Sequence, residues 1–324
     1  MSNPTEVVGV IVCAGDGTRA TSFTGGNSKE MLTCVDRPAI NLIIAEGLQA
    51  GINKFVIITN RRKTDLNHWV QGTHPKITEW TSNGKSATVA ACLEISEAAN
   101  IEIAYQDAPL GLGHAVLQAK DKVGNRPFVV FLPDEMMVDL VQNPNQDLPT
   151  PARELVDLGL KGWNATLTLE VPADQAHKYG IVEHEPSVDV DRPSATRLRE
   201  KPTLDAGDVQ PRNAIVGRYV FQPEFFAYLE ATKPGVGGEI QLTDAMNEFV
   251  NDGHPLLVTT PLGDVERFDI GGLDGYINFT SALIDARSRG IVPLSAAEAR
   301  NSLVHSGTVG IDARTINPAG ATRA

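Results

Sequence analysis

Cysteine is scarce in this chain, which holds only three in 324 residues. Cys13, Cys34 and Cys92 form no Cys-x-x-Cys pair and stand in apolar stretches. An odd number of isolated cysteines argues against a disulfide framework and against a zinc site. We therefore expect buried, reduced thiols in a cytoplasmic protein.

Long apolar runs and surplus positive charge are also missing. No apolar stretch approaches the roughly 20 residues that a membrane-spanning helix needs, and the polar N-terminus carries no basic-then-apolar signal. The formal net charge is −12. These absences argue against membrane insertion and against nucleic-acid binding as the main task. A polyanionic ligand would need the few cations gathered in one place, or a metal ion.

Residues 7–32 carry the clearest functional signal. The apolar, β-branched run 7–12 predicts a buried strand. The string AGDGTR follows at 14–19, and KEML ends the stretch at 29–32. Glycines directly after a strand let backbone N–H groups approach an anion, and Arg and Lys add donors that suit phosphate oxygens. The pattern predicts a triphosphate-binding loop.

Two commoner glycine motifs do not fit. The dinucleotide fingerprint needs a third glycine where Ala20 stands, and the Walker loop needs a glycine where Glu79 stands, before Gly84-Lys85-Ser86. What remains, GxGTR followed by KEML, is more specific than a lone glycine-rich turn.

The apolar runs predict an α/β fold. Strand-like runs at 54–59, 101–105 and 127–132 alternate with helical segments, which favours βαβ units and a parallel sheet. The polar residues 76–86 read as a loop. The second half is richer in short strands, so we expect a smaller β-rich subdomain there.

Two segments after predicted strands offer ligands for a nucleotide. Gln106 heads the string QxxPxGLGHA, which includes Gly111. A glutamine amide presents a donor and an acceptor, so it matches the imide edge of uracil or thymine. Asp134 follows the run 127–132, at the strand end where open α/β sheets bind ligands. The alternative for the Gln106 string is a Pro/Gly turn that caps a helix, and the alternative for Asp134 is a carboxylate that only caps its loop.

Two motifs of the second half say little by themselves. Glu200-Lys201-Pro202 could be a solvated ion pair before a proline, and Asp269 could be a turn aspartate. A carboxylate nevertheless suits sugar hydroxyls, and an ammonium suits a compact phosphate charge.

Taken in order, these motifs resemble those of the sugar-phosphate nucleotidylyltransferases, and most closely the bacterial UTP–glucose-1-phosphate uridylyltransferases. The matching strings are GxGTR, KEML, QxxPxGLGHA, LPD, YGIV, EKP, GEIQLTDA and RFDIG, within residues 8–290. One departure is Ser28, which stands where the family has proline. The preceding residues 24–27, TGGN, are expected to make the loop more flexible.

The resemblance implies a Rossmann-like, mixed and mainly parallel central sheet flanked by helices, with the β-rich subdomain on the sugar side. It implies one domain over residues 1–290, with a nucleotide half over about 1–140 and a sugar half over about 150–290. Residues 291–324 are expected to be a partly disordered extension.

The resemblance also assigns roles to the matching residues. It implies that Arg19, Lys29 and Lys201 act in catalysis and that Asp134 and Asp269 hold Mg²⁺. The implied nucleotide-binding residues are Ala14, Gly15, Gly17, Thr18, Glu30, Gln106 and Gly111. The implied sugar-binding residues are Gly180, Glu200 and Gly217.

The implied reaction joins UTP to glucose 1-phosphate, giving UDP-glucose and pyrophosphate, by Mg²⁺-dependent in-line displacement at the α-phosphorus. A homodimer or homotetramer is expected. Three alternatives stay open: thymidylyl transfer or another NDP-sugar pyrophosphorylase activity, a non-catalytic sugar-nucleotide sensor, and a nicotinamide dehydrogenase. The missing third glycine disfavours the last of these.

Overall fold

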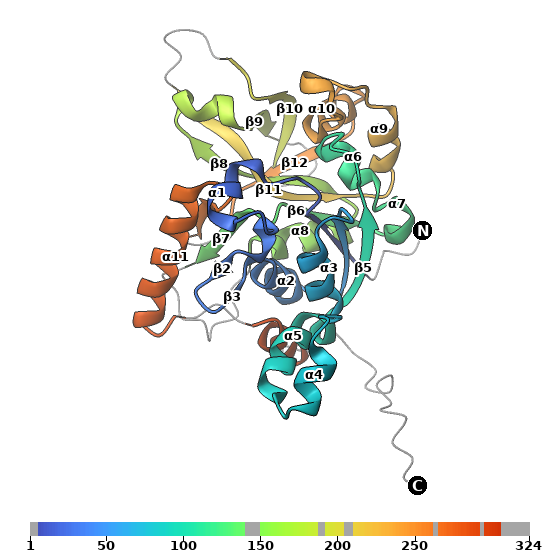
Figure 1. The fold of residues 1–324 in the computed structure, drawn as a ribbon. Helices are drawn as coiled ribbons and strands as arrows, with labels where there is room; N and C mark the ends of the chain where they lie inside the picture. The colour runs from blue at the N-terminus through green and yellow to red at the C-terminus, as the bar shows by residue number, and fades with distance from the viewer. Residues whose placement is uncertain are drawn as a thin grey trace.

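A computed structural model of the chain describes residues 6–139, 150–186, 192–203, 210–261, 265–291 and 295–305. A nine-stranded sheet runs through its centre, and helices cover both faces (Figure 1). The predicted α/β fold, with a mixed sheet and flanking helices, is confirmed.

The sheet joins a parallel half to a mixed half. Its strands, in spatial order, are β5 (Asn100–Tyr105), β4 (Lys54–Thr59), β1 (Val8–Val12), β6 (Phe128–Phe131), β11 (Arg212–Phe221), β8 (Asn164–Val171), β12 (Leu256–Thr259), β10 (Pro193–Glu200) and β9 (Gly180–Pro186). The first four are parallel, β11 is antiparallel to β6 and β8, and β9 and β10 form an antiparallel pair. The carboxyl ends of the parallel strands therefore meet at one end of the sheet.

Helices form one layer on each face. Because neighbouring strand residues point to opposite faces, β1 contributes Ile11 to one core and Val10 to the other. The Ile11 side is covered by α2 (Ala39–Gln49), α3 (Thr64–Gln71), α5 (Ser86–Ala98), α8 (Pro151–Leu160) and α11 (Leu273–Ser288). The Val10 side is covered by α6 (Leu112–Leu117), α7 (Lys120–Val123), α9 (Phe225–Ala231) and α10 (Leu242–Asn251). Among the described ranges, no helix has the length and apolar character that crossing a bilayer requires.

Two elements bear on the predicted loop and the predicted extension. The prediction of a loop at 76–86 is wrong, because the helix α4 (Ile77–Ser82) forms there. None of the residues of α4 is buried. A helix without a buried face has no hydrophobic period, so the pattern could not reveal it. Within the extension, α12 (Ala296–His305) packs on α2 and α5, and Ala296 and Ala299 are fully buried. Residues 306–324 lie outside the described part.

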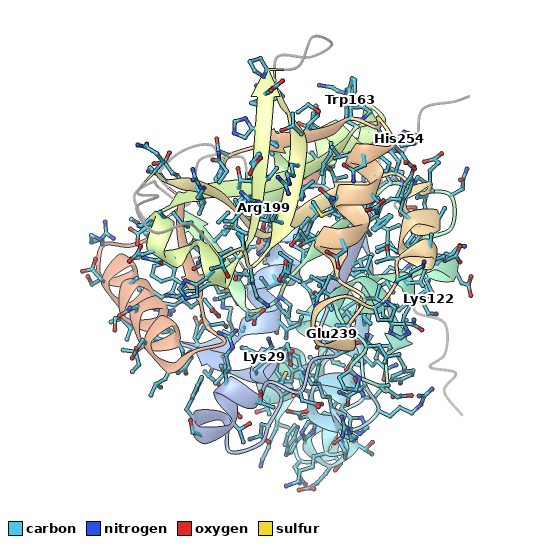
Figure 2. All side chains as sticks on the ribbon, turned by 90° about the horizontal axis from the view of Figure 1, so that it is seen from above. Lys29, Lys122, Trp163, Arg199, Glu239 and His254 are labelled. Atoms are coloured by element: carbon cyan, nitrogen blue, oxygen red, sulfur yellow. The ribbon has the colours of Figure 1, made fainter. Side chains whose placement is uncertain are left out.

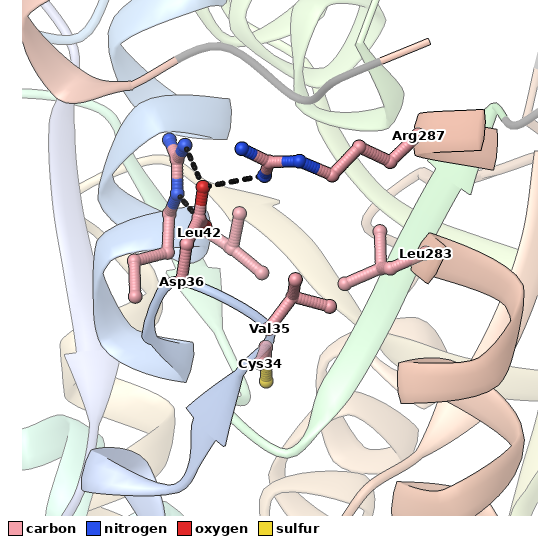
Figure 3. A pocket seen from close by; sticks show the side chains of 7 residues that line it. Cys34, Val35, Asp36, Leu42, Leu283 and Arg287 are labelled. Carbon is pink, nitrogen blue, oxygen red and sulfur yellow. Dashed lines mark hydrogen bonds and ion pairs between the residues drawn. The ribbon is translucent and has the colours of Figure 1, made fainter. Parts of the chain in front are cut away.

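Two short antiparallel pairs lie beside the main sheet. β7 (Glu135–Asp139) pairs with β13 (Val265–Asp269), and β2 (Thr33–Cys34) pairs with β3 (Arg37–Pro38). Asp36, in the β2–β3 turn, accepts a hydrogen bond from Arg37. It also accepts one from Arg287 of α11, as Figure 3 shows. Val35 in this turn has a φ of 66°, so the turn holds a branched residue in a strained conformation. The ion pairs therefore fix the turn just after the predicted triphosphate loop.

Candidate active site

The loop after β1 surrounds a small cavity. The cavity holds about 150 Å³ and is lined by Gly17, Thr18, Arg19, Lys29 and Gly271. Gly17 has a φ of 63°, which glycine adopts without strain, and a Cβ there would lie 3.5 Å from the Lys29 side chain. The two ends of the predicted triphosphate loop therefore meet at one polar cavity, together with a residue from just after β13.

Four charged side chains converge beside this cavity. Lys29 Nζ lies 2.5 Å from Asp134 Oδ2, and Arg19 Nη1 lies 3.1 Å from Asp269 Oδ2. Arg19 Nη2 is 3.9 Å from Asp134 Oδ2, which joins the two pairs into one cluster. Arg19 is 66% exposed whereas Lys29 is 17% exposed, so the Lys29 pair is the better shielded from solvent. Figure 2 shows Lys29 in the N-terminal half and Arg199 on the β9–β10 side of the molecule.

Backbone pairing brings the two aspartates together from distant parts of the chain. The β7–β13 pair ends beside both, where the Ile270 N–H donates to the Asp134 carbonyl oxygen at 2.9 Å. Gly271 lies against the cluster: a Cβ there would be 2.9 Å from Arg19 Nη2, Asp134 Oδ2 and Asp269 Oδ1. Any residue with a Cβ at this position would displace at least one of these three charged side chains.

The Lys29–Asp134 pair is held in its ionised form. Burial alone would raise the pKa of Asp134, but Lys29 and, more weakly, Arg19 outweigh burial and hold that pKa below its usual range. Burial alone would lower the pKa of Lys29, but Asp134 reverses this and raises it. Both groups therefore carry charge at neutral pH, where phosphate oxygens are also charged.

Glu30 belongs to the loop but lies beneath it. It is 1% exposed and accepts hydrogen bonds from Lys63 Nζ at 2.8 and 2.9 Å, while Lys63 also donates to the Cys13 carbonyl oxygen at 2.7 Å. Burial raises the pKa of Glu30 although Lys63 opposes it. Glu30 thus ties the loop to the end of β1, and it is absent from the lining of the phosphate-sized cavity.

Ser28 stands where the family has proline, and in the structure it donates hydrogen bonds to an aspartate. Its Oγ donates to Asp65 Oδ1 at 2.6 Å, and its N–H donates to Asp65 Oδ2 at 3.0 Å. Asp65 lies in the first turn of α3. Hydrogen bonding therefore restrains the backbone here, where the family uses the proline ring.

The predicted base corner folds onto the second half of the chain. Gln106 is 7% exposed, and its Nε2 donates to the Gly111 carbonyl oxygen at 3.0 Å and lies 2.8 Å from His114 Nδ1. The Gly113 N–H donates to the Ile240 carbonyl oxygen at 2.8 Å, and a Cβ on Gly111 would lie 2.6 Å from that oxygen. Packing against residues 239–241 therefore requires these glycines. The contact of Gln106 and Gly111 with a base stays a prediction.

The predicted sugar-side residues meet at the inner end of the β9–β10 pair. Gly180 pairs with Glu200 in the strand register, and Thr243 Oγ1 donates to Glu200 Oε2 at 2.8 Å. Lys201 follows with a φ of 42°, and its Nζ lies 3.3 Å from Glu200 Oε1. A carboxylate and an ammonium are thus presented together, as a phosphorylated sugar needs.

Arg218 supports the segment that follows β6. It is fully buried, binds both carboxylate oxygens of Glu46 at 2.7 and 3.0 Å, and donates to the carbonyl oxygens of Leu132 and Glu135. Its neighbour Gly217 has a φ of 69°, and a Cβ there would lie 2.9 Å from Glu135 Cγ. Packing therefore explains this glycine, and its sugar contact stays a prediction.

The structure brings the motif residues together in two groups, which we call the phosphate cluster and the sugar-side cluster after their predicted roles. The phosphate cluster contains Gly17, Thr18, Arg19, Lys29, Asp134 and Asp269. The sugar-side cluster contains Gly180, Glu200 and Lys201. Ala14 and Gly15 lead from β1 into the loop, where the Ala14 carbonyl oxygen accepts a bond from Asn60 at 3.0 Å. Sequence analysis missed Lys63, Asp65, Arg218, Thr243, Arg267 and Gly271. No isolated motif marks their roles, although Thr243, Arg267 and Gly271 lie inside strings that the resemblance had already singled out.

The two aspartates fit a divalent cation. Mg²⁺ is commonly held by one or two carboxylates, with phosphate oxygens and waters completing its octahedron. Asp134 and Asp269 meet beside the phosphate-sized cavity. Within the part of the chain that the structure describes, no group of three or more His, Cys, Asp or Glu side chains could hold a metal ion. Substrate phosphates would therefore have to supply further ligands.

Comparisons with known proteins agree with this geometry. A family model described as Nucleotidyl transferase matches residues 8–286. The chain is 35% identical to UTP–glucose-1-phosphate uridylyltransferase of Bacillus subtilis, over 84% of this chain and 88% of that protein. It is 34% identical to UTP–glucose-1-phosphate uridylyltransferase 2 of Streptococcus pyogenes, over 83% of this chain and 87% of that protein.

Solved structures are also similar to this chain. A UDP-glucose pyrophosphorylase complexed with UDP-glucose is similar with a TM-score of 0.72 at 27% identity, covering 87% of this chain and 99% of that one. A UTP-bound UGPase from Acinetobacter baumannii is similar with a TM-score of 0.70 at 29% identity, covering 86% of this chain and 93% of that one.

Proposed function

The chain belongs to the nucleotidyl transferase family, and on that premise we propose that it transfers a uridylyl group from UTP to glucose 1-phosphate. The products are UDP-glucose and pyrophosphate. The observation that carries the proposal is the convergence of Arg19, Lys29, Asp134 and Asp269 at one phosphate-sized cavity. A protein that only bound a sugar nucleotide would not need cations on the pyrophosphate side.

The reaction joins two mutually repelling anions, so positioning and charge neutralisation supply most of the rate. Arg19 and Lys29 hold the β- and γ-phosphates and stabilise the departing pyrophosphate. Lys201 holds the phosphate of glucose 1-phosphate, and Glu200 accepts hydrogen bonds from the sugar hydroxyls. An ionised oxygen of that phosphate attacks the α-phosphorus while the bond to pyrophosphate breaks. No proton has to move, which agrees with a cluster that contains no histidine.

Enzymes of this family generally use a divalent metal ion, and Mg²⁺ is the ion we assign. Asp134 and Asp269 would hold it, and when bound it would neutralise phosphate charge and polarise the α-phosphoryl group. Lys29 now lies 2.5 Å from Asp134. Lys29 therefore exchanges this carboxylate for a phosphate oxygen when substrate binds, so that each charge keeps a partner.

Pyrophosphate release tests the proposal directly. The purified chain with Mg²⁺, UTP and glucose 1-phosphate should release pyrophosphate at a rate that saturates in both substrates. Release with dTTP in place of UTP, but not with UTP, would make the chain a thymidylyltransferase. No release with any nucleoside triphosphate and sugar 1-phosphate would contradict enzymatic transfer and favour a binding protein.

A further inference from the structure

One arginine outside the two clusters contacts elements of both. Arg267 of β13 donates to both carboxylate oxygens of Glu135, at 2.5 and 2.6 Å, and Arg267 and Glu135 are each only 14% exposed. Its remaining nitrogen donates to Tyr179 Oη at 3.1 Å, and its guanidinium carbon lies 4.9 Å from the centroid of the Tyr179 ring. The planar guanidinium thus holds a carboxylate on one side and an aromatic ring on the other.

At its first end, Arg267 fixes the residues beside the predicted metal ligands. Glu135 directly follows Asp134 and stands opposite Asp269 in the β7–β13 register. Arg267 itself lies two positions before Asp269. A bidentate pair between neighbouring strands restricts sliding of β13 along β7. The separation of the two aspartates therefore depends on this pair.

At its second end, Arg267 fixes the residue that holds Lys201 in place. The Lys201 N–H donates to the Tyr179 carbonyl oxygen at 2.9 Å. Lys201 has a φ of 42°, a conformation that a residue with a side chain keeps only when its surroundings impose it. Tyr179 also directly precedes Gly180, which pairs with Glu200. The sugar-side cluster is thereby joined to the phosphate cluster through one side chain.

We propose that Arg267 is a positioning residue that sets the distance between the Asp134–Asp269 pair and Lys201. This inference rests on the proposed function, because in that reaction the distance decides whether the sugar phosphate lies in line with the α-phosphorus. Arg267 touches no reacting atom in this account. A displacement of about 1 Å between such groups can cost on the order of a hundredfold in rate.

The test measures two substrates separately. Arg267→Met should lower kcat/KM for glucose 1-phosphate on the order of a hundredfold, while calorimetric binding of UTP without sugar phosphate falls by a clearly smaller factor, because Arg267 also fixes the residues beside Asp134 and Asp269. Tyr179→Phe removes only the hydroxyl and should lower the same constant about five- to tenfold. Arg267→Lys keeps a charge for Glu135 but not the fork, and should fall between the two.

Arg199→Met is the matched control, because Arg199 pairs with Glu183 on the same β9–β10 pair and, in the described part of the chain, donates no hydrogen bond to Tyr179. It should leave both measurements unchanged. The Tyr179→Phe and Arg267→Met losses should also be non-additive in the double variant, since both remove one link. Should Arg267→Met fail to fold, Tyr179→Phe and Arg267→Lys with wild-type melting temperatures decide the question.

Equal losses of UTP binding and sugar-phosphate use, or no loss in Tyr179→Phe and Arg267→Lys, would overturn the positioning role. In either case the wild-type chain would still release pyrophosphate, so the proposed function would stand. A wild-type chain that releases no pyrophosphate would instead overturn the proposed function itself.

Discussion

At the scale of single residues, the site depends on its glycines as much as on its charged side chains. Gly271 leaves room for three charged side chains, and Gly17 adopts a φ of 63° that glycine tolerates without strain. The glycine in RFDIG was visible in the sequence as a flank of Asp269. Its closeness to Arg19 and Asp134 was not, because that depends on β13 pairing with β7.

Gly271→Ala should therefore inactivate the enzyme without unfolding it. The new Cβ would lie 2.9 Å from three charged atoms, so the cluster must spread. We expect kcat to fall at least about a hundredfold, measured as pyrophosphate release, with little change in melting temperature. Gly272→Ala is the control, because a Cβ at Gly272 would meet nothing within 4 Å. Comparable activity of the two variants would contradict this view of the cluster.

The Lys29–Asp134 pair gives a prediction about pH. In the folded chain Lys29 keeps the pKa of Asp134 below its usual range, so the pair stabilises the fold above the ordinary aspartate pKa and loses this as the solution is acidified through the lowered pKa. Without Lys29, burial would raise that pKa. Urea unfolding should therefore show Lys29→Met destabilised more at pH 7 than at pH 4. An equal or larger deficit at pH 4 would refute the coupling.

At the scale of elements, contacts between distant segments build the site. The strands could be predicted from apolar runs, and the loops from glycines that follow them. The pairing of β7 with β13 could not, because both are short and partly polar. The same holds for Arg218 and Glu46, which are 172 positions apart and bear no local signal of their ion pair.

Arg218→Met should destabilise the fold far more than a comparable change at the surface. Arg218 is fully buried, so its removal leaves the Glu46 carboxylate without the two hydrogen bonds that Arg218 donates to it. We expect a loss of about 3–5 kcal/mol in the free energy of unfolding. Arg287→Met breaks the half-exposed pair with Asp36 and should cost at most about 1 kcal/mol. Denaturant melts that rank the two the other way would contradict the assigned roles.

At the scale of the whole molecule, an acidic chain gathers cations at one end of its sheet. The motifs predicted which residues would do this, since phosphate and carboxylate chemistry restricts the choice. They did not predict that Glu30 would lie beneath the loop or that Ser28 would bond to Asp65. Both contacts are made with residues at the start of α3, Lys63 and Asp65, and no local pattern in the sequence predicts them.

The proposed division of the site between two substrates predicts a split effect for Lys201→Ala. Lys201 stands beside Glu200 and is not among the residues that line the phosphate-sized cavity. Its loss should raise KM for glucose 1-phosphate at least about tenfold, since a charged contact is worth about 1.5–3 kcal/mol. UTP binding, measured by calorimetry, should stay near that of the wild type. Equal weakening for both substrates would mean that Lys201 does not serve the sugar phosphate.

Turnover of Asp134→Asn tests the central claim most directly, because this change removes one carboxylate charge and almost no volume. We predict that pyrophosphate release from UTP and glucose 1-phosphate at ordinary Mg²⁺ falls at least about a thousandfold, while the variant stays folded at the assay temperature. A variant that turned over at the wild-type rate would contradict the account.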